Sequence, residues 1–189
     1  HDTARLAPRL TPDELAIAYG MILTMPGVPF LYYGDEIGMR YRNLPTKEGG
    51  YVRTGTRTPM QWDASANLGF STADASDLYL PVDPAADAPT VAAQRDDAHS
   101  LFQWVRGLLA LRARHPALNA DAPFDVVAAP DNGRLFVYSR TAMDGSERLV
   151  VALNPGLEPE TCAMPESDSS HGTPTMVFNR GEVTVNDAS

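Results

Sequence analysis

The chain of 189 residues has little cysteine and no long uninterrupted apolar run. Cys162 is the only cysteine, so no disulfide can form within the chain, and a reducing compartment or a lack of need for a cross-link would both fit. The longest mostly apolar stretch, residues 21–33, is broken by Pro26, Gly27 and Pro29. A membrane span needs about 20 apolar residues, so none is expected. Without the pattern of a signal peptide, we predict a cytoplasmic protein.

Basic residues are also too few to favour a polyanionic partner. Lys and Arg number 15 against 24 Asp and Glu, which gives a formal net charge of -9. Nucleic acids and anionic membranes bind through clustered Lys and Arg, so we expect neither as a partner. No group of residues has the spacing of metal ligands or of a phosphate-binding loop, and we predict no metal site and no cofactor. This charge is compatible with a neutral ligand such as a sugar.

Two long helices are predicted in the first two thirds of the chain. The first covers residues 12–24, because Thr11 is typical of an N-cap, Pro12 of a first helical position and Glu14 of a capping box. This segment is apolar nearly all round, so we expect it to be buried against something large. The second helix is predicted over residues 91–114, where apolar residues form a stripe at helical spacing.

One strand is predicted between these helices, over residues 28–34. The run is continuously apolar and aromatic, as expected for a strand covered on both faces. A helix, a short turn and a buried strand are typical of an α/β layer or barrel. Such a strand needs neighbours, and this is the only one in the first half of the chain. We therefore expect the rest of its sheet to lie upstream, in a longer protein of which this chain is a fragment.

Beyond about residue 121 the pattern changes to short strands joined by turns. Residues 124–128 and 135–140 flank a Pro-Asp-Asn-Gly turn and predict a β-hairpin. A further turn at residues 143–146 leads into a strand over residues 148–153. Weaker strands are predicted near residues 161–164, 175–179 and 182–185. We thus expect a small antiparallel β domain after a boundary near residues 116–122.

Two motifs in this frame resemble a known family. Residues 27–39 read GVPFLYYGDEIGM, and residues 57–63 read RTPMQWD, with Gly-Phe-Ser following at residues 69–71. This succession strongly resembles the α-amylase family of glycoside hydrolases (glycoside hydrolase family 13), nearest to its oligo-1,6-glucosidase and α-glucosidase branch. The resemblance covers roughly residues 1–155.

The family fold is a (β/α)8 barrel followed by an antiparallel β-sandwich. The resemblance implies that residues 1–116 form the C-terminal part of the catalytic barrel. It implies that residues 117–189 form an incomplete β-sandwich domain. Active sites of such barrels lie at the C-terminal ends of the strands. Both the start of the chain and residues 34–36 would be strand ends on this map.

The catalytic prediction rests on the first two residues. Retaining glycosidases use a carboxylate nucleophile and a carboxylic acid about 5 Å apart. His1-Asp2, with Arg5 shortly after, is similar to the end of the strand-seven motif of the family. The resemblance implies that Asp2 is the third carboxylate of the family, which binds sugar hydroxyls and stabilises the transition state. The nucleophile and the general acid would lie upstream, so the chain is predicted to be inactive alone.

Three further residues are predicted by resemblance to contact substrate. His1 would bind a sugar hydroxyl in the first subsite, and Arg5 would line the aglycone side. Arg57 would pair with an upstream aspartate at the non-reducing end, a task that suits a planar guanidinium. The alternatives are a tag remnant for His1, a helix-flanking salt bridge for Arg5 and a surface loop arginine for Arg57.

Other polar and aromatic residues have weaker claims. Asp35 and Glu36 are adjacent, and neighbours on an extended segment point to opposite sides, so they would not both face one bond. We expect structural or rim contacts from them. Trp62 is expected to anchor its loop rather than to stack on a sugar. Tyr51 and residues 47–50 fall where family members vary in the substrate cleft.

The leading functional hypothesis is a retaining α-glucoside hydrolase that acts on α-linked oligosaccharides. The second is a transglycosylase or isomerase of the same family, of the trehalose synthase or amylosucrase type. The third is a non-catalytic carbohydrate-contacting β module, against which the buried helix and lone strand argue. Ca²⁺ could bind the upstream part of a parent enzyme. The fragment is expected to self-associate or to need the missing barrel, because its apolar faces have no complete sheet to pack on.

Overall fold

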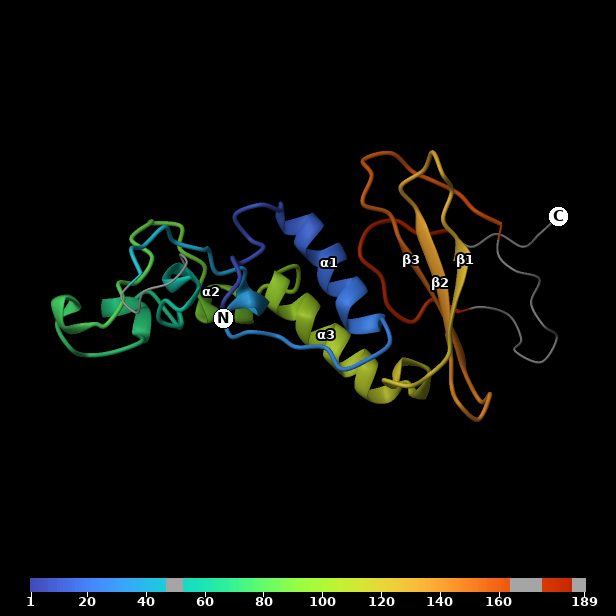
Figure 1. Cartoon of the computed structure of the whole chain (residues 1–189), viewed down its shortest axis with the longest axis horizontal. Helices are drawn as coiled ribbons and strands as arrows, with labels where there is room; N and C mark the ends of the chain where they lie inside the picture. Colours follow the sequence, from blue (N-terminus) through green and yellow to red (C-terminus); the bar gives the residue numbers. More distant parts are fainter. Residues whose placement is uncertain (47–52, 164–174, 185–189) are drawn as a thin grey trace. The chain divides into compact units, whose positions relative to one another are not determined.

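The computed structural model describes residues 1–46, 53–163 and 175–184, which form two compact units (Figure 1). One unit comprises residues 1–23 and 29–109, and the other comprises residues 24–28 and those from 110 on. The helices are α1 (Pro12–Thr24), α2 (Val91–Arg95) and α3 (Leu101–Arg114), with short 3-10 turns η1 (Asp35–Ile37), η2 (Thr54–Thr56), η3 (Ala66–Gly69), η4 (Ala75–Asp77) and η5 (Pro116–Leu118). The strands are β1 (Phe124–Ala128), β2 (Phe136–Thr141) and β3 (Arg148–Leu153). The domain boundary between residues 116 and 117 stays a prediction.

Helix α1 begins where the sequence predicts. The backbone N–H of Glu14 donates to Thr11 Oγ1 at 3.3 Å, and Glu14 Oε2 accepts from the Thr11 backbone N–H at 2.7 Å. This reciprocal pair satisfies two backbone donors at the start of a helix and is a capping box. Pro12 occupies the first helical position, where a missing N–H costs nothing.

The burial of α1 is one-sided. Leu15, Ala16, Tyr19 and Leu23 are buried, whereas the side chains of Met21 and Ile22 are 41% and 39% exposed. On the buried side, the indole N–H of Trp104 in α3 donates to the Ala16 carbonyl at 2.8 Å, so the two helices lie together (Figure 1). The expectation of burial all round is therefore met on one face only.

The prediction of one helix over residues 91–114 is wrong, because α2 and α3 are separate. Between them, Asp97 Oδ1 accepts from the His99 backbone N–H at 2.9 Å. Ser100 Oγ then accepts from the Gln103 backbone N–H at 3.2 Å and caps α3. Asp and Ser side chains that bind nearby backbone groups compete with helical hydrogen bonds, so the chain breaks one helix and starts another here.

The prediction of a strand over residues 28–34 is also wrong for the chain as described. These residues form no β-ladder, and the Phe30 side chain is 88% exposed. A strand exists only where a neighbour accepts its hydrogen bonds, and no described segment of this chain pairs with residues 28–34. The sequence pattern is that of a covered strand, but the covering elements are not among the described residues.

The second unit contains a three-stranded antiparallel sheet in the order β1-β2-β3, with β2 in the centre (Figure 1). Phe124 of β1 faces Arg140 of β2, and the register runs regularly from β2 to β3. The predicted hairpin of residues 124–128 and 135–140 is confirmed by the antiparallel pair β1 and β2, and the strand predicted over residues 148–153 is β3. Residues 161–163, 175–179 and 182–184 form no strand, and the remaining residues of those predicted strands lie outside the described ranges. The described residues thus hold one sheet and do not confirm a β-sandwich.

Tyr138 of β2 forms the centre of the second unit. Its ring lies 5.1 Å from the ring of Phe124 and 5.2 Å from that of Phe136, measured between centroids. Its hydroxyl is hydrogen-bonded to the hydroxyl of Thr24, the last residue of α1. Burial raises the pKa of Tyr138, so the phenol stays neutral and can make this bond at any ordinary pH.

Arg140, also in β2, is fully buried and makes a second link to Thr24. Its guanidinium donates to the backbone carbonyls of Thr24 at 2.5 Å and Asn119 at 2.6 Å. The carbonyls of Ala122 and Pro123 accept at 3.1 Å and 3.3 Å. A buried cation requires such partners, and three of these carbonyls, those of Asn119, Ala122 and Pro123, belong to the connection between η5 and β1. One side chain therefore joins this connection to the end of α1.

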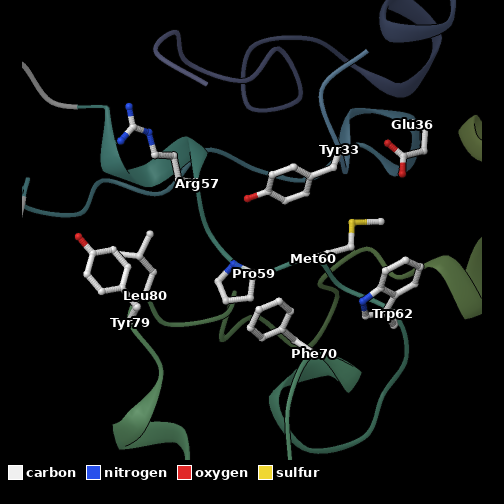
Figure 2. A pocket seen from close by; sticks show the side chains of 9 residues that line it. All are labelled: Tyr33, Glu36, Arg57, Pro59, Met60, Trp62, Phe70, Tyr79 and Leu80. Atoms are coloured by element: carbon white, nitrogen blue, oxygen red, sulfur yellow. The ribbon is translucent and has the colours of Figure 1, made fainter.

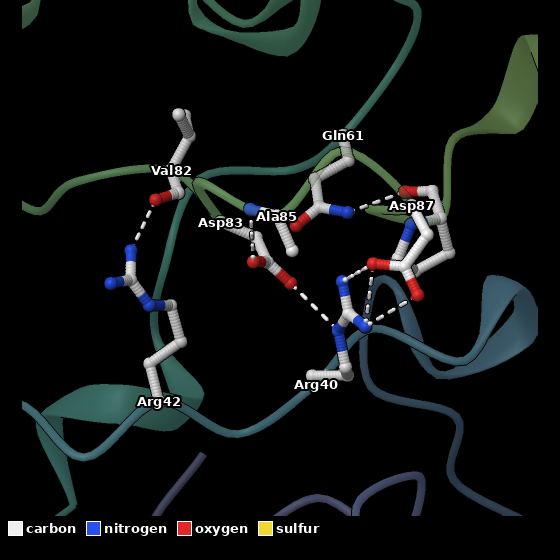
Figure 3. Close-up of polar contacts among 8 residues, drawn as sticks. Arg40, Arg42, Gln61, Val82, Asp83, Ala85 and Asp87 are labelled. Carbon is white, nitrogen blue, oxygen red and sulfur yellow. Dashed lines mark hydrogen bonds and ion pairs between the residues drawn. The ribbon is translucent and has the colours of Figure 1, made fainter.

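In the first unit, the long irregular segment is held by side chains rather than by periodic structure (Figure 3). Arg40 Nε donates to Asp83 at 2.8 Å, and its terminal nitrogens lie 3.1–3.2 Å from the Asp87 carboxylate. The Gln61 side chain donates to the Pro89 carbonyl. The contacts of Arg40 tie residues 83–87 to the segment that follows residue 39, and the contact of Gln61 ties residue 89 to residue 61.

Replacing Arg140 should destabilise the second unit. We expect Arg140→Met to keep the aliphatic volume but leave buried carbonyls without donors, at a cost of about 3 kcal/mol in the free energy of unfolding. The matched control is Arg134→Met, because the Arg134 side chain is exposed. Urea unfolding followed by tyrosine fluorescence measures both. Equal midpoints for the two variants would contradict the assigned role of Arg140.

The capping box of α1 should make stability depend on pH. Hydrogen bonds from the backbone and side chain of Thr11 lower the pKa of Glu14 below its usual 4.5. A group whose pKa is lower in the folded state stabilises fully above its unfolded pKa, and the effect is lost as pH falls through the folded pKa. We expect Glu14→Gln to lower the unfolding temperature at pH 7 and to have little effect at pH 3. Glu158→Gln, on an exposed side chain, is the control and should change neither value.

Candidate functional site

The carboxylate of Asp2 lies among three nitrogen-bearing side chains. Arg57 Nη2 donates to Asp2 Oδ1, and Arg53 Nη1 lies 3.5 Å from the same oxygen. His1 Nε2 lies 3.2 Å from it. The Asp2 side chain is 38% exposed, so this group is accessible to a ligand. The structure thus brings together three of the four residues predicted from the sequence: His1, Asp2 and Arg57.

The two arginines are placed by the buried turn η2, which they flank. Thr56 Oγ1 donates to the carbonyl of Thr3 at 2.7 Å and joins this turn to the residue after Asp2. Gly55 is required in the turn, because a Cβ there would lie 1.5 Å from the carbonyl oxygen of Arg42. A glycine at the closest approach of two backbones therefore allows η2 to pack at this place.

Arg5 occupies a different position from the other predicted residues. Its side chain is 1% exposed, and Nη1 donates to the Tyr33 carbonyl at 2.8 Å and to Asp35 Oδ1 at 2.7 Å. Nη2 donates to the Thr56 carbonyl at 2.9 Å, and the guanidinium lies 5.1 Å from the ring centroid of Tyr32. This is the geometry of the salt-bridge alternative. A contact between Arg5 and substrate stays a prediction.

Electrostatics keep Asp2 ionised. The hydrogen bond from Arg57 is the largest cause that lowers the pKa of Asp2, and the charges of Arg53 and Arg57 add to it against a desolvation that raises it. An ionised carboxylate has about four lone-pair positions and only accepts hydrogen bonds. Asp2 can therefore accept hydrogen bonds from the hydroxyl groups of a ligand while it is held by the arginines.

An open hollow lies beside this cluster, with a volume of about 500 Å³ (Figure 2). Arg57 lines the hollow as well as contacting Asp2, and Glu36 also lines it. The exposed rings of Trp62, Phe70 and Tyr79 add apolar surface. Ligand sites combine apolar and aromatic walls with a few polar groups, which is the composition found here.

Asp35 and Glu36 have separate surroundings, although they lie on the turn η1 rather than on an extended strand. Asp35 binds Arg5, whereas Glu36 lines the hollow. Gly34 and Gly38 flank this turn with φ of 82° and 71°, in the left-handed region that favours glycine. A Cβ at Gly34 would also lie 2.1 Å from Met39 Sδ.

Sequence reasoning missed Arg53. The available signal was the spacing Arg-Thr-Gly-Thr-Arg over residues 53–57, which puts two arginines at the ends of one tight turn. Tyr51 and residues 47–50 lie outside the described residues. Within the described ranges, no group of three or more His, Cys, Asp or Glu could hold a metal ion. No helix in that part of the chain is long and apolar enough to cross a membrane.

Comparison with known proteins connects this geometry to a family. The family model described as "Alpha amylase, catalytic domain" matches residues 1–121. Trehalose synthase/amylase TreS of Mycobacterium tuberculosis is 38% identical over 159 residues, which cover 78% of this chain and 25% of TreS. Oligo-1,6-glucosidase of Heyndrickxia coagulans is 30% identical, over 82% of this chain and 33% of its own length.

A solved structure agrees with these sequence matches. An inactive double mutant of MutB in complex with isomaltulose superposes with a TM-score of 0.71 and 25% identity. The match covers 88% of this chain and 35% of that one, so this chain spans about a third or less of the proteins to which it is similar. Together with the catalytic-domain match over residues 1–121, these similarities show that the chain belongs to the α-amylase family, glycoside hydrolase family 13.

Proposed function

We propose that the chain is the C-terminal part of a retaining enzyme that acts on α-glucosidic bonds of oligosaccharides. The observation that carries the proposal is the accessible, ionised carboxylate of Asp2, held by Arg57 and Arg53 beside an aromatic hollow. The cluster lies in the part of the chain that matches the catalytic domain of the family. In this proposal Asp2 is the third carboxylate of the active site, beside the nucleophile and the general acid, and His1 and Arg57 contact substrate.

The chemistry assigned to Asp2 is binding and charge stabilisation. Retaining glycosidases pass through an oxocarbenium-like transition state, in which positive charge develops on the sugar ring. A carboxylate that accepts hydrogen bonds from ring hydroxyls holds the distorted sugar and places negative charge near that ring. In this proposal the nucleophile and the general acid come from segments upstream of His1. The arginines keep Asp2 in the ionised form that this role requires.

The relatives support hydrolysis and glycosyl transfer about equally. The oligo-1,6-glucosidase favours hydrolysis, and the trehalose synthase of Thermus thermophilus, at 35% identity, favours isomerisation by transfer. The trehalose synthase/amylase of Mycobacterium tuberculosis, at 38% identity, is named for both kinds of reaction. Both reactions can share a covalent glycosyl-enzyme intermediate and then differ in whether water or a sugar hydroxyl accepts the glycosyl group. Incubation of the longer enzyme with maltose separates them: glucose alone indicates hydrolysis, and an isomeric disaccharide indicates transfer. The match to a catalytic domain disfavours the non-catalytic β module.

Exposed apolar residues of the first unit support the proposal that the chain is part of a longer enzyme. Phe30, Met21 and Ile22 are exposed, although the sequence around them has the pattern of buried elements. Exposed apolar area costs about 25 cal/mol per Å². We propose that upstream segments of the same enzyme cover it, and that the isolated chain self-associates. The cytoplasmic location stays a prediction.

The 189-residue chain alone should not cleave a nitrophenyl α-glucoside. The proposal places the nucleophile and the general acid upstream. This chain alone then supplies neither the carboxylate that attacks the anomeric carbon nor the acid that protonates the glycosidic oxygen. Release of nitrophenol is measured by absorbance, with the longer enzyme as the positive control. If the pure chain releases nitrophenol and its Asp2→Asn variant does not, the nucleophile cannot lie upstream, and the proposal is contradicted.

In the longer enzyme, Asp2→Asn should lower kcat by about 10²- to 10³-fold, because it removes the negative charge opposite the transition state while keeping the shape. Steady-state kinetics on the same glucoside measure the effect. The matched control is Asp131→Asn, an exposed aspartate of the second unit, which should retain full activity. Equal kcat in the two variants would remove Asp2 from the mechanism.

A further inference from the structure

We propose that Arg53 is a positioning residue, which holds the Asp2 carboxylate in the orientation in which it meets a sugar hydroxyl. The inference rests on the proposed role of Asp2 and deepens it. It concerns a residue that lies outside the two sequence motifs, at residues 27–39 and 57–63.

Three side chains converge on Oδ1 of the Asp2 carboxylate. Arg57 Nη2 donates to it, Arg53 Nη1 lies 3.5 Å away and His1 Nε2 lies 3.2 Å away. The Asp2 side chain is 38% exposed, so a carboxylate held by these groups can still meet a ligand. Contacts that converge on one oxygen orient the carboxylate.

Arg53 is placed for this contact by the backbone. It precedes the turn η2, where the Thr56 N–H donates to the Arg53 carbonyl at 3.1 Å. The same turn is fixed to the start of the chain through the Thr56 hydroxyl on Thr3 and the Arg5 guanidinium on the Thr56 carbonyl. The backbone that carries Arg53 is therefore tied to the residue next to Asp2. The Arg53 guanidinium can then reach Asp2 Oδ1 by rotation of its side chain, without a movement of the backbone.

Two arginines are needed because Arg57 has a second task. Arg57 lines the hollow, and its Nε lies 3.4 Å from the His1 carbonyl. In the proposed function it also contacts substrate. A ligand that engages Arg57 competes with its hold on Asp2, whereas Arg53 does not line the hollow. Arg53 can then keep Asp2 oriented while substrate is bound.

The charges around Asp2 give this role a signature in pH. The groups that face the carboxylate are the guanidiniums of Arg53 and Arg57, the imidazole of His1 and the α-amino group of His1, which would be a peptide bond in a longer chain. The charge of Arg53 lowers the pKa of Asp2, so its removal should raise that pKa. Activity that requires the carboxylate should then fall off at a higher pH on the acid side.

The test is a double-mutant cycle in the longer enzyme. Arg53→Gln should lower kcat by about 10- to 100-fold with little change in KM, since misplacing a group by about 1 Å can cost this much. In the Asp2→Asn background the same substitution should change kcat by less than about twofold, because Arg53 acts through Asp2. Arg53→Lys keeps the charge and the fold and should recover part of kcat and the acid limb of the pH profile. Arg9→Gln, on an exposed arginine, is the control and should leave kcat unchanged.

The outcomes separate the two proposals. A full effect of Asp2→Asn with no effect of Arg53→Gln would overturn the role of Arg53 and leave the proposed function standing. Equal losses from Arg53→Gln in both backgrounds, or no recovery with Arg53→Lys, would mean that Arg53 supports the fold rather than Asp2. No effect of Asp2→Asn would instead overturn the proposed function, and the role of Arg53 with it.

Discussion

The buried guanidinium of Arg5 is the interaction on which the first unit depends. A cation without water must be paired, and Arg5 takes the carboxylate of Asp35 and the carbonyls of Tyr33 and Thr56 as its partners. These partners come from segments that have no ladder of hydrogen bonds to join them. Arg5 therefore sets the distance between the start of the chain, the turn η1 and the turn η2. The surroundings of Asp2 follow from that distance.

The features that sequence predicted well are those with local causes. The capping box of Thr11 and Glu14 and the hairpins that join β1, β2 and β3 each depend on residues a few positions apart. The strand over residues 28–34 depends on distant partners, and a pattern of apolar residues does not supply them. The break before α3 also has a local cause, which is the capping by Asp97 and Ser100. The apolar stripe continues across this break, so the sequence pattern predicted one helix.

The candidate site divides in the same way. Asp2, His1 and Arg57 were predicted through a resemblance that carried their spacing, and the structure brings them together. Arg53 was missed because its contact depends on how η2 packs against the first residues, which is a tertiary fact. Arg5 was predicted as a substrate contact, and its burial could not be derived from its position beside a helix. The family resemblance predicts which positions hold functional residues. Only the packing of the folded chain shows which of their hydrogen-bond donors already bind other protein groups.

The role proposed for Asp2 requires a carboxylate that is both ionised and oriented. Arg53 and Arg57 lower the pKa of Asp2 and contact its carboxylate. The most direct measurement is a crystal structure of the longer enzyme with a slowly reacting α-linked disaccharide. We expect the Asp2 carboxylate to contact the two arginines and to lie within about 3 Å of a sugar hydroxyl next to the scissile bond. A sugar bound in that enzyme with Asp2 turned away from it, or out of reach, would contradict the central claim.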